Sequence, residues 1–414
     1  MAPSLDWIGD AESAPTSVGP GRSLALAGIL LVALNLRSAV ANLSPIISEI
    51  RADIGLPVWV VGVLGMLPPV CFAIFGVFAP VLTRRFGLEV MVIVALAAIT
   101  LGHLARGLAP SQLWLMLGSV LAFAGLGIGN VLLPPLVKKY FPDRIGLVTS
   151  IYVVLLSIST TLPAILAVPI ADSSSWRVSL GMWAIFGVLA LIPWVSLVVR
   201  HRTGTPADQP DEADAVVIGR LWRSPLAWAM AIVFGTSSLN AYAMFAWMPQ
   251  MLHDIAGSTP TQAGALLSLY AIMGLPAGLL VPWLATRMGQ RVGLLVYAGV
   301  AFFLIGDLGL LLIPGTATWL WVAFAGLGPL LFPLALVLIN LRSRTHAGSV
   351  ALSGFTQGVG YTFGALGPLL VGYLHEVSGG WTVPLIFLGV IALGAAFAGA
   401  VVARPHMIED EQRS

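Results

Sequence analysis

The sequence predicts an all-α integral membrane protein with twelve transmembrane helices, arranged as two six-helix repeats. Hydrophobic residues make up 58% of the 414 residues and charged residues only 9%, whereas about 25% of residues are charged in soluble domains. Twelve apolar runs follow one another, each near the roughly 20 residues that a helix needs to cross a bilayer. Short sequences also recur in the two halves of the chain at nearly constant spacing. Together these observations exclude an ordinary soluble protein.

The apolar runs fall into two groups of six, separated by one long connection. The first group is expected at about 24–49, 58–82, 88–107, 113–137, 146–171 and 176–199, and the second at about 225–252, 261–285, 292–313, 318–341, 348–373 and 381–403. The predicted domains are therefore a disordered cytoplasmic tail over 1–22, an N-terminal bundle over 23–199, a cytoplasmic linker over 200–224, a C-terminal bundle over 225–403 and a second cytoplasmic tail over 404–414. The first tail is rich in Pro, Ser, Gly and Ala and lacks the apolar centre of a signal peptide.

Lysine and arginine are distributed unevenly between the two sides of the predicted bundle. One alternate set of connecting segments holds sixteen of them, whereas the opposite set holds only Arg51, Arg106 and Arg177. Basic residues concentrate in cytoplasmic loops, so both termini are predicted to be cytoplasmic. The expected location is the cytoplasmic (inner) membrane, which the chain crosses many times.

Internal repeats support a duplicated bundle. The sequence AFAGLG occurs at 122–127 and again at 323–328, in the fourth predicted helix of each half. Matches around the second helices recur at an offset of 202, as in Gly62 with Gly264, and Pro45 matches Pro249 at an offset of 204. Two similar bundles that rock about a shared site are what an alternating-access transporter requires.

The first predicted helix carries a charge, Arg37, near its middle. A charged side chain at that depth costs at least about 2.5–3.5 kcal/mol, so Arg37 is expected to face a protein-lined or water-filled interior. Its guanidinium offers a planar fork of donors suited to a carboxylate, a nitro group or a small linear anion. Asn35 and Asn42 could orient such a ligand, and Pro45 could bend the helix near its outer end. The alternative is a structural arginine bonded to helix carbonyls or to an acid.

The loop after each second helix carries a short basic motif, LTRRFG at 82–87 and LATRMG at 284–289. This motif resembles that of the major facilitator superfamily, although Arg84 and Thr286 replace its Asp. The segments ALNLRSAVANLSPIISEIRADIGLP (33–57) and GMLPPVCFAIFGVFAPVLTRRFG (65–87) resemble the cyanate and 2-nitroimidazole transporter family. The resemblance implies movement of small compounds, such as cyanate inward or nitroimidazoles outward.

The superfamily resemblance also implies which helices line a central cavity, namely the first, fourth, seventh and tenth, with the eleventh among those beside them. Polar residues at similar depth on these helices are further candidates for substrate binding: Asn130, Asn240, Tyr242, Gln357 and Tyr361. Polar groups at the bilayer centre need partners, which are substrate, water or another helix.

Three titratable residues are candidates for proton coupling: Asp307, His103 and Glu49. Asp307 is the one acid inside a predicted span away from its ends, and His103 lies at a similar level in the equivalent helix of the first half. For each, a position at the membrane interface is the favoured interpretation over a proton relay.

The leading functional hypothesis is a secondary transporter for a small anionic or polar organic compound, with a proton as a second candidate partner. It is expected to function as a monomer in the lipid bilayer, without nucleic acid. No cofactor is expected because no G-x-x-x-x-G-K-[ST] loop is present, and the single cysteine, Cys71, offers no metal-ligand spacing. The alternatives are an exporter of a neutral aromatic compound, a channel and a membrane-embedded enzyme. The enzyme lacks any H-E-x-x-H or G-x-S-x-G motif.

Overall fold

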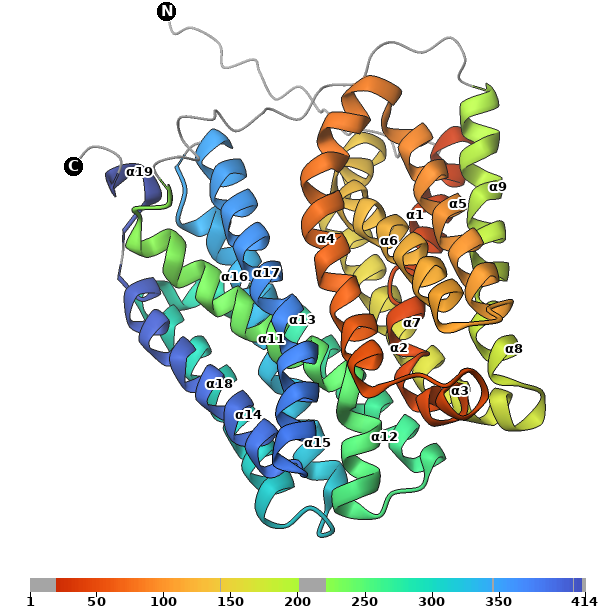
Figure 1. Ribbon diagram of the computed structural model, residues 1–414. Helices are drawn as coiled ribbons and strands as arrows, with labels where there is room; N and C mark the ends of the chain where they lie inside the picture. The colour runs from red at the N-terminus through yellow and green to blue at the C-terminus, as the bar shows by residue number, and fades with distance from the viewer. Residues whose placement is uncertain (1–19, 142, 201–220, 345, 405, 412–414) are drawn as a thin grey trace, which may run out of the picture.

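The computed structural model describes residues 20–200 and 221–411, except for residues 142, 345 and 405. Every regular element in this part of the chain is a helix (Figure 1). The predicted tail over 1–22 and the linker over 200–224 fall mostly outside the described residues.

Six spans make up the N-terminal half. The first consists of four short pieces, and the sixth of two. In chain order the elements are α1 (Pro20–Asn35), α2 (Ser38–Ala41), η1 (Ser44–Ile46), α3 (Ile47–Ile54), α4 (Val58–Phe86), α5 (Leu88–Gly107), α6 (Gln112–Tyr140), α7 (Ile145–Ser173), α8 (Trp176–Gly181) and α9 (Ala184–Arg200).

The C-terminal half has six spans and a short terminal helix. Its elements are α11 (Pro225–Ala256), α12 (Pro260–Ile272), α13 (Gly274–Met288), η2 (Gly289–Val292), α14 (Gly293–Leu312), α15 (Thr318–Leu327), η3 (Gly328–Leu330), α16 (Leu331–Leu341), α17 (His346–Ser378), α18 (Thr382–Val402) and α19 (Ile408–Glu411).

The predicted fold class is confirmed. Eleven spans in the described ranges are long and apolar enough to cross a membrane. The remaining long helix, α17, is rich in glycine and carries polar residues because much of it packs against α4 and α11. Agreement is close in places: the prediction of 88–107 coincides with α5. Elsewhere the helix continues beyond the apolar run, as in α6, which extends to Tyr140.

The two halves pack against each other mainly through two helix pairs, α4 with α17 and α7 with α12. In Figure 1 the halves approach each other around α12 and diverge toward the end where the labels N and C lie. Small residues allow the close approach: a Cβ added at Gly65 would lie 2.7 Å from the Cβ of Ala246 and 2.8 Å from that of Pro368. The Ser268 hydroxyl donates a hydrogen bond of 3.0 Å to the Thr161 carbonyl across the same interface.

The duplication is also visible in how helices end and pack. Gly55 ends α3 with φ = 66°, and Gly257 ends α11 with φ = 65°, a left-handed conformation that glycine adopts without a Cβ penalty. Gly102 in α5 and Gly306 in α14 each approach the next helix so closely that an added Cβ would lie 2.5 Å from a backbone nitrogen. Equivalent positions of the two halves therefore serve equivalent structural purposes.

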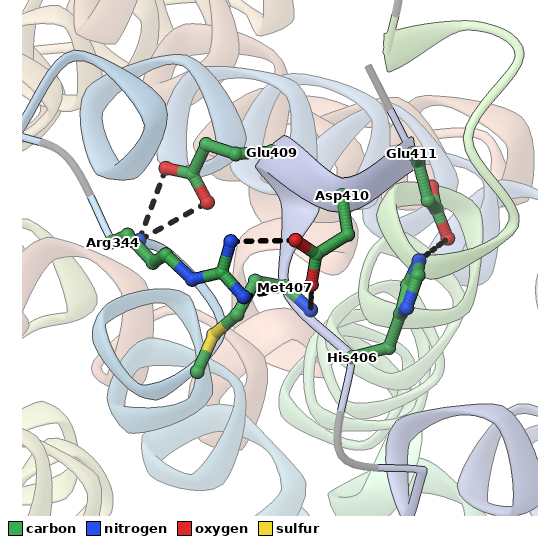
Figure 2. Close-up of polar contacts among 6 residues, drawn as sticks. All are labelled: Arg344, His406, Met407, Glu409, Asp410 and Glu411. Atoms are coloured by element: carbon green, nitrogen blue, oxygen red, sulfur yellow. Dashed lines mark hydrogen bonds and ion pairs between the residues drawn. The ribbon is translucent and has the colours of Figure 1, made fainter. Parts of the chain in front are cut away.

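The segment after α18 packs back onto the C-terminal half. The Arg344 guanidinium donates to both carboxylate oxygens of Asp410 at 2.5 and 3.0 Å, and the Arg344 backbone N–H donates to Glu409 (Figure 2). The backbone N–H of Ile408 donates to the carbonyl of Arg342 at 2.9 Å. The predicted tail over 404–414 thus includes the helix α19, which is bonded to the connection between α16 and α17.

Candidate functional site

The first span is interrupted at the position of Arg37. Helix α1 ends at Asn35 and α2 begins at Ser38, so the helical hydrogen-bond ladder is broken between them. The backbone N–H of Arg37 donates instead to the Ser159 hydroxyl of α7, at 3.0 Å. The helix was expected to bend at Pro45, and the 3₁₀ turn η1 lies there. The helix is also interrupted about two turns earlier, so that Arg37 lies between α1 and α2.

The Arg37 guanidinium lies over an aromatic ring contributed by the next span. Its central carbon is 5.5 Å from the centroid of the Phe72 ring in α4, a distance at which the cation is attracted to the ring face. The side chain is half-buried, and none of the ion pairs among the described residues includes it. The structure thus places a positive charge in the bundle without an acidic partner in the described ranges.

Two tyrosines from the C-terminal half complete an aromatic cluster around this charge. Tyr242 of α11 and Tyr361 of α17 meet the Phe72 ring edge-on, with centroid distances of 6.3 and 5.8 Å. Both tyrosines are within electrostatic reach of Arg37. We name Arg37, Phe72, Tyr242 and Tyr361 the central cluster. Because its members come from both halves, any relative movement of the halves changes its shape.

A narrow pocket adjoins the central cluster on the side away from the termini. Tyr242 lines both the pocket and the central cluster. The other walls come from α2, η1, α3, α4, α6 and α11, with Ser44, Phe123 and Phe245 among the lining residues. Arg37 is not part of its lining. The pocket is mostly apolar, as small-molecule sites usually are.

A buried polar network holds the broken span against α5. His103 donates from Nδ1 to the Leu180 carbonyl at 3.1 Å and pairs through Nε2 with the Ser38 hydroxyl at 3.2 Å. Arg106 donates to the Ala39 carbonyl at 2.9 Å and to Asn42 Oδ1 at 3.3 Å. Both His103 and Arg106 are fully buried. The Ala39 carbonyl is free to accept because α2 ends too soon to supply a helical donor.

Arg106 is the residue that the sequence interpretation missed, because it was assigned to a connecting loop. In the structure its guanidinium lies 5.8 Å from the centroid of the Phe123 ring, so the residue belongs to the bundle interior. A signal for this was present: Arg106 follows His103 by three residues, so the two side chains lie on one helix face.

The other asparagine and glutamine candidates do not converge on the central cluster. Asn35 donates to the Leu31 and Phe186 carbonyls, and Asn42 accepts from Arg106. Three further candidates each donate within their own helix, as listed here: Asn130 to the Leu126 carbonyl, Asn240 to the Thr236 carbonyl and Gln357 to the Ser353 hydroxyl. Of the predicted binding residues, only Arg37, Tyr242 and Tyr361 meet in the central cluster.

Two of the three coupling candidates are buried inside the protein, near the ends of their helices. Asp307 is 3% exposed and His103 is 0% exposed, because both side chains point into their bundles. Glu49 is half-buried in α3, at the end opposite the termini. Within the described ranges, no group of three or more His, Cys, Asp and Glu residues could hold a metal ion.

Comparison with known proteins places these features in a family. Residues 26–365 match the model of the Major Facilitator Superfamily. The chain is 32% identical over 392 residues to the 2-nitroimidazole transporter of Escherichia coli (strain K12), covering 94% of this chain and 98% of that protein. It is 26% identical over 373 residues to the cyanate transport protein CynX of the same organism, covering 88% and 94% of the two chains.

A solved structure shares the fold. The crystal structure of a bacterial homolog to the human lysosomal transporter Spinster, in an inward-facing and unoccupied conformation, superposes with a TM-score of 0.74 at 14% identity. The alignment covers 94% of this chain and 98% of that one. Family model, relatives and fold agree: the chain is a multi-pass membrane transporter of the major facilitator superfamily and belongs to its cyanate and 2-nitroimidazole transporter family.

Proposed function

We propose that this transporter moves a small anionic or polar organic compound, of the cyanate or nitroimidazole type, across the cytoplasmic membrane by alternating access. The observation that supports it is the central cluster: a half-buried guanidinium without an acidic partner in the described ranges, enclosed by aromatic rings from both halves. Such a charge attracts an anion, or the negative end of a polar group, in a medium of low dielectric constant.

Each member of the central cluster has a chemical task in this proposal. Arg37 binds the carboxylate, nitro or cyanate group through its planar fork of donors. The hydroxyls of Tyr242 and Tyr361 supply further donors, and the Phe72 ring supplies an apolar face against which a flat ligand can lie. When the halves rock, Arg37 and Phe72 move relative to the two tyrosines, so the ligand is released to one side or the other.

In Figure 1 the halves lie apart at the end where the termini lie and together at the opposite end. In the proposed orientation both termini are cytoplasmic, so the open end is the cytoplasmic one. We propose that the protein works as a monomer, because each chain contributes both halves of the site. The direction of transport follows from the gradient that drives it.

A second candidate function is the export of a neutral aromatic compound. Three of the four members of the central cluster are aromatic, and the name of one relative, the 2-nitroimidazole transporter, denotes a flat aromatic compound. In this alternative the rings bind the ligand, and Arg37 contributes only by holding Phe72.

Ligand-dependent thermal stability of the purified protein tests both. The panel is cyanate, nitrite, acetate, benzoate, 2-nitroimidazole and the uncharged compound benzamide, each with wild type, Arg37→Ala and Arg37→Lys. A ligand at a hundred times its dissociation constant stabilises the fold by about 2.7 kcal/mol. The proposal expects an anion or nitro compound to stabilise wild type, Arg37→Lys to respond weakly and Arg37→Ala not at all.

The matched control is Arg51→Ala, which removes a cation of α3 that bonds only locally to the Leu56 carbonyl, and it should respond as wild type does. An Arg37→Ala variant that is folded and responds fully to the anions would refute the role of Arg37. If benzamide, and no anion, stabilises both wild type and Arg37→Ala, the result would favour an exporter of neutral aromatic compounds. Counterflow of labelled ligand in proteoliposomes separates a transporter from a channel.

A further inference from the structure

Asp307 is the only carboxylate in the described part of the chain that is buried. It lies in the second half of α14, five residues before the helix ends, and neither of its oxygens has a hydrogen-bond partner among the described residues. Desolvation of an ionised carboxylate costs several kcal/mol unless donors or a cation compensate it. A residue of this kind inside a membrane bundle needs a functional explanation.

The surroundings of Asp307 contain one titratable group, the Tyr270 hydroxyl of α12. Tyr270 is 2% exposed, its hydroxyl also lacks a hydrogen-bond partner, and it is within electrostatic reach of Asp307. The helices packed on α14 are α15, α16, α18 and η3, and their sequences contain no Asp, Glu, His, Lys or Arg. Arg291 of η2 adjoins the start of α14 but is exposed and lies more than four helical turns from Asp307.

We infer that Asp307, together with Tyr270, is the proton-binding site that couples transport to a proton gradient. In the present conformation the carboxylic acid holds its proton, because no cation or donor of the described residues contacts it to stabilise the charge. The O–H bond breaks when a rearrangement admits water or brings the Tyr270 hydroxyl into contact with the carboxylate, and the proton leaves to water. No other bond changes.

The repeat provides an internal comparison. His103 occupies the corresponding place in α5, 204 residues earlier, and is equally buried, but both of its ring nitrogens have partners. The His103 side chain is therefore held in place as part of the network around the broken span. Asp307 is the member of this pair whose polar atoms remain unpartnered.

Tyr270 connects Asp307 to the moving parts of the protein. Its ring meets the Phe245 ring edge-on at 5.6 Å, and Phe245 lines the pocket beside Tyr242. Ser268, two residues earlier on α12, donates to the Thr161 carbonyl of the other half. Helix α12 thus contacts the proton site, the pocket wall and the interface between the halves. Protonation of Asp307 can therefore bias the packing of the helix on which the rocking movement depends.

This inference rests on the proposed function, because a coupling site requires transport. The experiment uses full-length protein in proteoliposomes, with Asp307→Asn and Tyr270→Phe as variants and Glu376→Gln, an exposed acid near the end of α17, as the matched control. Labelled 2-nitroimidazole and labelled cyanate are the probes. Two modes are compared, accumulation driven by an imposed pH gradient and counterflow at equal pH.

Gradient-driven accumulation by Asp307→Asn should be at least tenfold lower than that of wild type. Its counterflow should equal that of wild type, because the amide mimics the protonated acid. Tyr270→Phe should retain accumulation but shift its pH dependence upward, because the donor for the ionised form is lost. Glu376→Gln should match wild type in both modes. Wild-type accumulation by Asp307→Asn, or loss of both modes in the folded variant, would overturn the inference.

Infrared spectroscopy tests proton binding without a substrate. The carbonyl stretch of a protonated carboxylic acid should be present in wild type and Glu376→Gln at neutral pH and absent in Asp307→Asn. If neither probe is transported by wild type but the band is assigned to Asp307, the substrate assignment fails and the proton site stands. If no such band is assigned to Asp307 at any pH, the proton site itself is refuted.

Discussion

Replacing Gly65 with valine should shift the protein toward a state in which its halves separate at the end opposite the termini. Gly65 lies in α4 and faces Ala246 of α11 and Pro368 of α17, so its contacts cross the interface between the halves. An added Cβ would lie 2.7 and 2.8 Å from the Cβ atoms of these residues, well inside the 3.5–4.0 Å at which carbon atoms attract one another. Valine adds two further methyl groups at the same place.

The size of the effect follows from the cost of overpacking, which is typically about 1–3 kcal/mol. This cost applies only to the conformation in which α4 touches α11 and α17, and separation of the halves removes it. A change of about 1–3 kcal/mol in a two-state equilibrium corresponds to roughly 5- to 150-fold in the population ratio. If wild type mostly occupies the present conformation, the variant should populate both conformations to a measurable extent.

Distances between spin labels provide the assay. Labels at Ser48 of α3 and Thr261 of α12 report on the two halves, because both residues are exposed at the end opposite the termini. The buried Cys71 is first replaced by alanine so that only the introduced sites react. The Gly65→Val variant should add a population at longer distance, and ligand should change the ratio of the two populations.

Two further glycines serve as controls. A Cβ at Gly394 meets nothing within 4 Å, so Gly394→Val should leave the distances unchanged. A Cβ at Gly102 would lie 2.5 Å from the backbone nitrogen of Ala122 in the same half, so Gly102→Ala should lower thermal stability without altering the distances between halves. If Gly65→Val keeps both the wild-type distances and the wild-type stability, the interface does not hold the halves together as described.

Two other contacts give predictions about stability. Arg106→Met should destabilise the fold by about 1–3 kcal/mol for each buried acceptor left without a donor, namely the Ala39 carbonyl and Asn42 Oδ1; an unfolding temperature equal to that of wild type would contradict this. At the terminal helix, the hydrogen bond and charge of Arg344 hold the pKa of Asp410 below its usual value. A lowered folded-state pKa stabilises the protein above the unfolded value, near pH 4, and this contribution is lost as the pH falls through the folded value. Thermal unfolding measured from pH 6 down to pH 3 should therefore show an acid-dependent loss in wild type that is smaller in Arg344→Gln; parallel profiles would refute the contact's role.

The number of spans and most of their boundaries follow from the amino-acid sequence without knowledge of the packing. The bilayer imposes this information locally: each span must supply its own run of apolar residues, whatever its neighbours are. The prediction of 318–341 therefore coincides with the segment that α15, η3 and α16 fill. The internal repeat can likewise be detected without knowledge of the packing, because matches such as AFAGLG are found by comparing the two halves of the sequence. The charge of Arg37 indicated the position of the central cluster, because a cation within a membrane span is costly unless it faces the interior of the bundle.

The pairing of the polar side chains and the position of the break in the first span depend on how the helices pack. The interruption before Ser38 depends on a hydroxyl of α7 and a guanidinium of α5, which come from distant parts of the chain. Burial of Arg106 and Asp307 depends on which face of each helix the neighbouring helices cover, and a nearly uniform apolar sequence does not encode that face by periodicity. The meeting of Phe72 with Tyr242 and Tyr361 required the docking of one half on the other. The bilayer requires an apolar run in each span, so the span positions can be found from local sequence. The site forms only when the twelve helices pack against one another.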